Sequence, residues 1–241
     1  MFVRYRTEAI FLKKLKRFEA DEFLIAYTEE FGKIGVTGKS IRKIKSKLRS
    51  SSELFCHSDI EFVRGKHYNI LTDSELISSH SLIKKDLGKT SLAFRMADLL
   101  DSFLAEEEKD EHLWFFIFKS FHLLEELETE EDKGKKLKLF YYYFAFKFLE
   151  LLGYGLEVDS CSLDKENKGS VFSPREGGLV CRMCSEKLRD PLKVKLSNGD
   201  RKLLAAIKNK NFEDFLDEDY EFSLIGEVFK NYLTLLPSRK S

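Results

Sequence analysis

Along the first third of the chain, hydrophobic and polar residues alternate with a period of two. The segments that do so are YRTEAIFLKKL, EFLIAYTEEFGKIGVTGK, LFCHSDIEFV and HYNILTDSEL, with turns at Gly32 and Gly65. Such alternation in β-branched and aromatic residues predicts about five antiparallel strands. Because about five short strands cannot bury two faces as a sandwich, we expect a small closed barrel over residues 1–78.

From about Ser81 the apolar residues recur three and four positions apart instead. SLAFRMADLLDSFL, EHLWFFIFKSFHLLEEL and KKLKLFYYYFAFKFLELLGY each have this spacing and predict helices. The third is apolar around most of its circumference, so we expect it at the centre of the core. Shorter helical patterns follow Pro191. The chain is therefore expected to be α+β, with an all-helical domain over residues 79–241 and an inserted loop module at 156–190.

The charge of the chain is balanced overall but unevenly distributed. The 41 Lys and Arg residues equal the 41 Asp and Glu residues, so net charge alone indicates no polyanionic partner. From Lys33 to Arg49, however, the chain has a basic run without a single acid. The N-terminus lacks an apolar signal core, and no apolar stretch approaches the roughly 18–20 residues that span a bilayer. We therefore expect a cytoplasmic protein without a membrane segment.

Three of the four cysteines lie close together in the sequence. The segment CSLDKENKGSVFSPREGGLVCRMC begins at Cys161 and ends in the Cys-x-x-Cys pair of Cys181 and Cys184. This clustering favours a metal site in a reducing compartment over a disulfide framework. The fourth, Cys56, lies within a predicted strand, and we expect it in the barrel core. His57 then faces the opposite side of that strand, where we expect it to be exposed or to face a nucleic acid.

Several segments, in this order, resemble the RecO family of bacterial recombination mediators and DNA repair proteins. They are YRTEAIFL, GKSIRKIKSKLRSSSELF, VRGKHYNIL, ELLGY and FSPREGGLVC, of which the last is the most specific. The resemblance covers nearly the whole chain. It implies an N-terminal OB-fold, a helical domain with a four-cysteine zinc module, and binding of single- and double-stranded DNA. It also implies two activities, strand annealing and RecA loading, and two partners, RecR and the tail of single-stranded-DNA-binding protein (SSB). The implied role is non-enzymatic and nucleoid-associated.

The basic run supplies the cations that an OB-fold uses to bind a phosphate backbone. If the run is extended, alternation places Lys43, Lys45, Lys47 and Arg49 on one side of the chain. A solvated loop is the alternative, but the absence of acids and the barrel favour DNA binding without sequence specificity. Aromatic side chains near enough to stack on bases are Tyr5, Tyr27 and Tyr68. The expected DNA-binding residues are Lys33, Lys39, Arg42, Lys43, Lys45, Lys47, Arg49, Arg64, Lys66 and His67.

The zinc module of the family holds its metal with two Cys-x-x-Cys pairs, and this chain departs from that pattern. The matching positions are Cys161, Asp164, Cys181 and Cys184, so an aspartate replaces the second thiolate. Zinc accepts carboxylate oxygen, and we expect a structural zinc site with these four ligands. A metal-free loop and a redox-active Cys-x-x-Cys pair are the alternatives; the second lacks a surrounding thioredoxin-like βαβ pattern.

No motif for catalysis is present. The sequence has no phosphate-binding Gly-x-x-x-x-Gly-Lys loop, no Gly-x-Ser-x-Gly and no His-Glu-x-x-His. We therefore expect a DNA-binding recombination mediator rather than an enzyme. Two alternatives remain open: a protein-interaction adaptor whose barrel no longer binds nucleic acid, and an RNA-binding factor that uses the same groove.

Overall fold

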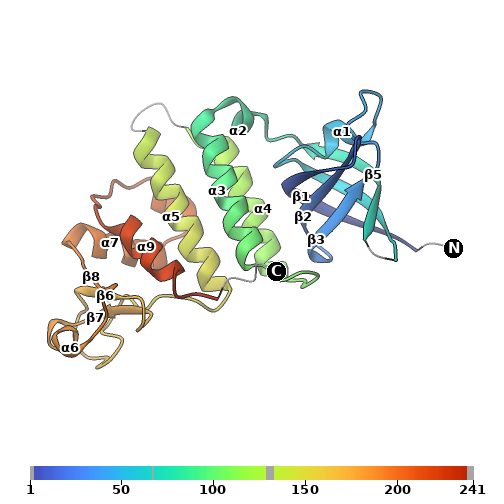
Figure 1. Ribbon diagram of the computed structural model, residues 1–241. Coiled ribbons are helices and arrows are strands. Elements are labelled where there is room, and N and C mark those ends of the chain that lie inside the picture. The colour runs from blue at the N-terminus through green and yellow to red at the C-terminus, as the bar shows by residue number, and fades with distance from the viewer. Residues whose placement is uncertain (1–2, 67, 129–132, 238–241) are drawn as a thin grey trace. The chain divides into compact units, whose positions relative to one another are not determined.

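The computed structural model describes residues 3–66, 68–128 and 133–237, which form two compact units. The first unit ends at Glu128 and the second runs on to Pro237. Among the described residues, the first contains the barrel and four helices, and the second contains the remaining helices and a small sheet (Figure 1). The compact unit around the barrel thus extends beyond Ser78, the last residue of the barrel strands.

A five-stranded closed barrel forms the N-terminal part of the first unit, in the strand order β1-β2-β3-β5-β4. This order and the closure confirm the predicted OB-type barrel. One detail of the prediction was wrong, because β3 and β5 are parallel where Val36–Gly38 pairs with Asn69–Leu71. A ring with an odd number of strands cannot alternate in direction throughout, so one adjacent pair must be parallel. The strands are β1 Arg4–Arg17, β2 Asp21–Thr28, β3 Gly32–Gly38, β4 His57–Arg64 and β5 Asn69–Ser78.

The barrel core is built from every second residue of its strands, as the alternation requires. Phe11, Leu24, Val36 and Phe62 are fully buried there, and Cys56 lies with them as expected. A short helix, α1 (Leu48–Ser51), follows the segment after β3 and packs Leu48 against this core. The outward-facing residues of β1, β2 and β3 therefore remain available for other contacts.

Helices α2 (Ser81–Lys85), α3 (Leu87–Phe103) and α4 (Glu111–Glu126) complete the first unit. Asp86 and Asp110 begin the two long helices, because their carboxylates accept hydrogen bonds from the free backbone N–H groups of the first turn. Most of the apolar residues at helical spacing are buried, and so is Trp114; the buried ones are Leu92, Met96, Leu99, Leu100, Phe103, Leu113, Ile117, Phe121 and Leu124. The side of β4 that carries His57 packs against α4.

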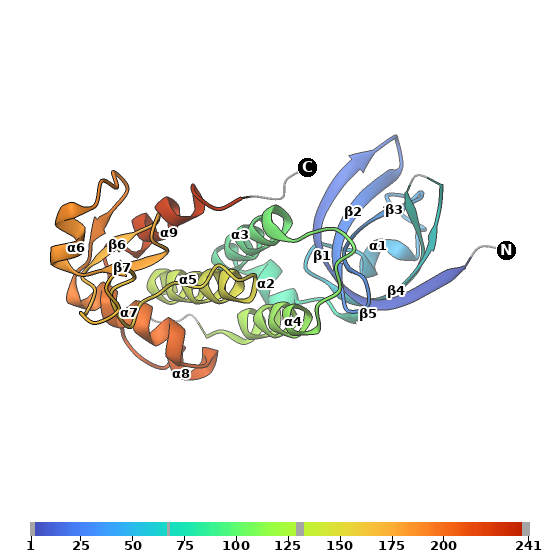
Figure 2. The same ribbon diagram turned by 90° about the horizontal axis from the view of Figure 1, so that it is seen from below.

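The second unit is centred on the aromatic helix α5 (Lys133–Leu151), which buries Phe140, Phe144 and Phe148. The helices expected after Pro191 are present as α7 (Asn198–Asn209) and α9 (Ile225–Leu233), with α8 (Phe212–Leu216) between them. A small sheet of order β7-β6-β8 was not predicted, because strands of two or three residues are too short to show a period. Figure 1 labels all three strands, and Figure 2 shows β6 and β7 from below. Its strands are β6 Val171–Ser173, β7 Gly178–Val180 and β8 Val194–Lys195, and α6 (Arg182–Lys187) follows β7.

Among the described residues, no helix combines the length and the apolar character that crossing a bilayer requires.

Candidate nucleic-acid surface and metal site

The basic loop, residues 39–49, follows β3 as a series of turns rather than a strand, and its last residues, including Arg49, begin the short helix α1. The backbone N–H of Lys43 donates to the carbonyl of Ser40 at 3.1 Å, and that of Ser46 donates to the carbonyl of Lys43 at 2.9 Å. The run is therefore not extended, so the condition under which alternation would align Lys43, Lys45, Lys47 and Arg49 on one side is not met. In these turns, backbone N–H and carbonyl groups bond to one another within the segment. In a barrel strand the same groups would need a neighbouring strand as their partner.

The cations of the basic loop are exposed, and most of them lack an acidic partner. Within the described ranges, no carboxylate forms an ion pair with Lys39, Lys43, Lys45, Lys47 or Arg49. Arg42 is bonded to backbone carbonyl groups instead. Its guanidinium donates to the carbonyl of Glu19 at 3.0 Å, and its backbone N–H donates to the carbonyl of Ala20 at 3.1 Å. Arg42 thus fastens the basic loop to the turn between β1 and β2.

Lys33 occupies a different environment from the rest of the predicted set. Its side chain is buried, and its Nζ donates to the backbone carbonyl of Asp101 at 2.9 Å and lies 3.6 Å from a carboxylate oxygen of the same residue. The outward face of β3 is covered by α3 at this position. Alternation along β3 identifies the outward direction but does not reveal which helix lies there.

Two further predicted cations are Arg64, the last residue of β4, and Lys66, which follows that strand. Arg64 lies 3.4 Å from the carboxylate of Glu107 and 5.1 Å above the ring of Tyr5. Lys66 is exposed and lines a hollow of about 370 Å³ on the barrel surface, together with Tyr68. His67, which was also predicted to bind DNA, lies outside the described residues.

The three aromatic residues named from the sequence lie in very different environments. Tyr27 is fully buried, and Tyr5 is half-buried and stacks on Phe62. Only Tyr68 is exposed, at 39%. Sequence reasoning missed Arg17, whose guanidinium lies 4.8 Å from the centre of the Tyr68 ring. The sequence feature that could have identified Arg17 as a candidate is its position at the end of a predicted strand, next to an aromatic residue.

The prediction for His57 was wrong. It faces away from the barrel core, as alternation requires, but it is 5% exposed. Its ring packs against Phe118 and its Nε2 lies 2.8 Å from the carboxylate of Glu8. Helix α4 covers this side of the strand, so His57 is a contact between barrel and helix.

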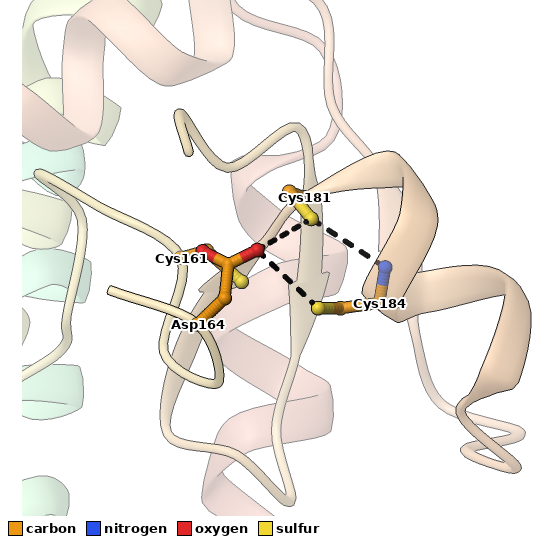
Figure 3. A group of neighbouring side chains, drawn as sticks. All are labelled: Cys161, Asp164, Cys181 and Cys184. Carbon is orange, nitrogen blue, oxygen red and sulfur yellow. Dashed lines mark hydrogen bonds between the residues drawn. The ribbon is translucent and has the colours of Figure 1, made fainter. Parts of the chain in front are cut away.

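Cys161, Asp164, Cys181 and Cys184 converge in the second unit, and their ligand atoms all lie within 4.8 Å of one another. One carboxylate oxygen of Asp164 lies 3.2 Å from the sulfur of Cys181 and 3.5 Å from that of Cys184 (Figure 3). Ligands around tetrahedral zinc are separated by about 3.5–3.8 Å, given zinc–sulfur and zinc–oxygen bonds of about 2.3 and 2.0–2.2 Å. The four ligand atoms would therefore surround a zinc ion if the two most widely separated atoms moved about 1 Å closer together.

Backbone hydrogen bonds fix the loop that supplies the first two of these residues. The carbonyl of Leu179, in β7, accepts from the N–H of Ser162 at 2.7 Å, and the N–H of Leu179 donates to Glu157 at 2.7 Å. Gly178 permits this approach, because a Cβ there would lie 2.3 Å from the carbonyl oxygen of Glu157. Cys181 then begins α6, whose first turn carries Cys184.

The carboxylate of Asp164 is held in its charged form. Hydrogen bonds from the backbone and side chain of Asn167, and then one from Cys181, keep the pKa of Asp164 well below its usual range. The other Asp164 oxygen accepts from the N–H of Glu166 at 3.0 Å and from that of Asn167 at 3.1 Å. Burial raises the pKa of Cys161, but backbone hydrogen bonds from Asp164 and Cys181 outweigh it and lower the pKa. An oriented anion beside three thiols is a donor set that binds divalent zinc.

Known proteins match the chain along most of its length. The family model described as "Recombination protein O N terminal" matches residues 1–80, and "Recombination protein O C terminal" matches residues 84–220. The DNA repair protein RecO of Thermoanaerobacter sp. is 30% identical over 217 residues, which are 90% of this chain and 81% of that protein.

Two further RecO proteins are similar to the chain. That of Caldanaerobacter subterraneus subsp. tengcongensis is 31% identical over 77% of this chain and 73% of its own length. That of Dehalococcoides mccartyi is 33% identical over 75% and 70%. Together with the barrel, the helices and the cysteine–aspartate cluster, these matches establish that the chain belongs to the RecO family of DNA repair and recombination proteins.

Proposed function

We propose that the chain is a non-enzymatic mediator that binds single- and double-stranded DNA without sequence specificity and anneals complementary strands. Membership of the RecO family supports this proposal. It also supports RecR and the SSB tail as protein partners, RecA loading as the outcome, and a cytoplasmic, nucleoid-associated location. The observation that carries DNA binding is the basic loop, with its exposed cations that have no acidic partner in the described ranges.

Binding through this loop depends on counterion release. A Lys or Arg that neutralises a phosphate frees condensed cations, so affinity falls as salt rises, with a slope of about −0.7 per contact on single strands. Among the residues that the structure describes, no carboxylate has to be released first by Lys39, Lys43, Lys45, Lys47 or Arg49. Phosphate contacts carry no sequence information and leave the base edges accessible, which is the condition that annealing requires.

The cysteine–aspartate cluster supports a structural zinc ion in the second unit. We propose that Cys161, Asp164, Cys181 and Cys184 hold it. Bound zinc would join the loop before β6 to the start of α6, two segments otherwise connected by backbone hydrogen bonds through β7. All four positions are occupied by side chains, so this donor set indicates a structural role.

A titration with a fluorescent single-stranded oligonucleotide at increasing salt tests DNA binding. The triple variant Lys43→Glu, Lys45→Glu, Lys47→Glu should lose most affinity, and the salt slope should fall by about 2. A matched control is Lys168→Glu, Lys187→Glu, Lys195→Glu, three exposed lysines of the second unit. Annealing of complementary oligonucleotides should collapse in the first triple variant only.

Each alternative function has its own outcome in this experiment. If wild-type protein shows no salt-dependent binding, the mediator proposal is wrong and the adaptor alternative replaces it. If it binds an RNA oligonucleotide much more tightly than DNA of the same sequence, the RNA-binding alternative is favoured, because the 2′-hydroxyl distinguishes the two.

A further inference from the structure

A cluster of one cation and three aromatic rings lies on the barrel beside the basic loop. The guanidinium carbon of Arg17 is 4.8 Å from the ring centre of Tyr68, 5.8 Å from that of Phe23 and 5.9 Å from that of Phe18. Its terminal nitrogen also donates to the hydroxyl of Thr37 at 3.3 Å, which fixes the guanidinium above β3. We call Arg17, Phe18, Phe23 and Tyr68 the aromatic cluster.

The aromatic cluster faces away from the barrel core. Leu24 points inward, so Phe23 points outward on the same strand. Its ring lies over Gly35, where a Cβ would be 2.4 Å from the ring. With Leu15 and Lys16, the residues Arg17, Phe23 and Tyr68 line a hollow of about 460 Å³. Phe23 and Tyr68 also line the adjoining hollow that contains Lys66.

Phe18 is the most unusual member of the cluster. It is 80% exposed at the turn between β1 and β2, and its φ of 53° lies in the left-handed region. A bulky residue there is a conformational outlier, and an exposed ring of this size forgoes the stabilisation that burial provides. Neither property helps the fold. Both are consistent with a side chain that meets a ligand.

The cations of the basic loop lie next to this cluster. Arg42 is bonded to the carbonyls of Glu19 and Ala20, which follow Phe18 directly, and the N–H of Ser40 donates to the carboxylate of Asp21 at 2.7 Å. The loop is therefore fastened to the turn that presents Phe18. The positive charge of the basic loop is thus held next to an exposed ring, and this combination is complementary to a chain of phosphates with unpaired bases.

Acidic residues limit where such a chain can run. Glu106 and Glu107 also line the hollow that contains Lys66, and Glu107 pairs with Arg64. Asp21 accepts from Ser40, and Glu22 lies 3.3 Å from the ammonium of Lys14. A strand that leaves the basic loop thus meets Phe18 and Tyr68 first, and the carboxylates oppose a path beyond Arg64.

We infer that the aromatic cluster is a base-stacking subsite for unpaired nucleotides of a single strand. It rests on the proposed function, because the ligand is the nucleic acid that the basic loop binds. Bases stack on the exposed faces of Phe18 and Tyr68, while Arg17 braces the rings from behind by its cation–π contacts. In a duplex the base faces are already covered by neighbouring pairs, so the subsite acts on single strands and not on duplex DNA.

The test compares two oligonucleotides with the same phosphate backbone, one of thymidines and one with abasic sites at its central positions. Wild-type protein should bind the thymidine strand more tightly, because both strands offer equal charge but only one can stack. The double variant Phe18→Ala, Tyr68→Ala should lose about tenfold or more for the thymidine strand. Its affinity for the abasic strand and for duplex DNA, and its salt slope, should remain unchanged.

The control is Phe115→Ala, which removes a ring of 63% exposure from α4 in the same unit. Tyr68→Phe keeps the ring and should retain affinity, whereas Tyr68→Leu should lose it, which separates stacking from a general loss of structure. Salt-dependent binding that does not change in the double variant overturns the subsite and leaves the proposed function intact. Absence of salt-dependent binding by wild-type protein overturns both.

Discussion

The ammonium of Lys33 in β3 donates to the backbone carbonyl of Asp101 in α3 at 2.9 Å. The carboxylate of Asp101 also accepts from the ammonium of Lys13 in β1 at 3.1 Å. One residue of the helix thus holds two strands of the barrel. A lysine that the sequence predicts to contact DNA instead joins two elements of the first unit.

Lys33→Met should therefore affect stability and not DNA binding. Loss of the buried charged hydrogen bond should lower the free energy of unfolding by about 2 kcal/mol. Urea unfolding followed by the fluorescence of Trp114, the single tryptophan of the chain, measures this in the unit that contains the barrel. Lys39→Met is the control and should leave stability within about 0.5 kcal/mol. A Lys33 variant with normal stability but a reduced salt slope of DNA binding would contradict this assignment.

The purified protein should contain one zinc ion per chain by native mass spectrometry. Asp164→Asn should weaken zinc binding by about 100-fold or more, since even residues that only support a ligand are worth about 10–100-fold. Asp164→Cys should retain the metal, because it restores a thiolate. Glu166→Gln removes a neighbouring exposed carboxylate and should have no effect. Protein that takes up no zinc under reducing conditions would refute the site.

His80 should make the first unit less stable in mild acid. It is 2% exposed, its Nδ1 lies 2.7 Å from the carbonyl of Phe55, and burial lowers its pKa from the usual 6.5. Well above pH 6.5 the histidine is neutral in both the folded and the unfolded state, so this contribution to stability is complete there. As the pH falls below that value, the unfolded chain takes up the proton first and stability decreases.

The measurement is urea unfolding at a series of pH values between about 7.5 and 5, followed by Trp114 fluorescence. His80→Asn keeps a donor for the carbonyl of Phe55 and suits the left-handed φ of 44° at this position. It should flatten the acid side of the profile. An identical slope in both proteins would assign the pH dependence to groups other than His80.

Gly32→Ala and Gly134→Ala should have opposite effects. Gly32 turns the chain between β2 and β3 with a φ of 61°, and a Cβ there would lie 2.1 Å from the carbonyl oxygen of Glu108. The substitution should cost about 2 kcal/mol or more. Gly134 lies in α5 with open space around it, so alanine should stabilise the second unit by about 0.5–1 kcal/mol. Thermal unfolding of each variant checks the two signs.

The fold could be predicted largely because period two and period 3.6 are local properties of the sequence. Contacts between elements were not accessible in this way. His57 and Lys33 point outward from their strands as alternation predicts, yet helices cover both. Whether the basic loop is extended or turned was left open, because turns without proline leave little signal in the sequence. Phe18 and Arg17 become candidates for nucleic-acid binding only through a contact between elements. The turn that follows β1 is hydrogen-bonded to the basic loop, and the sequence does not reveal this contact.

The ring of strands closes where β3 meets β5, through three residues of each. Separation there breaks fewer hydrogen bonds than between β1 and β4, which pair from Arg4 to Ile10. The segment that leaves β3 is the basic loop, and the segment that enters β5 carries Tyr68. Transient opening of the barrel should therefore occur most readily at this junction. Such opening would change the distance between the basic loop and the segment that carries Tyr68. Amide hydrogen exchange at Thr37 and Ile70, faster than at Thr7 and Ile60, would reveal such a hinge.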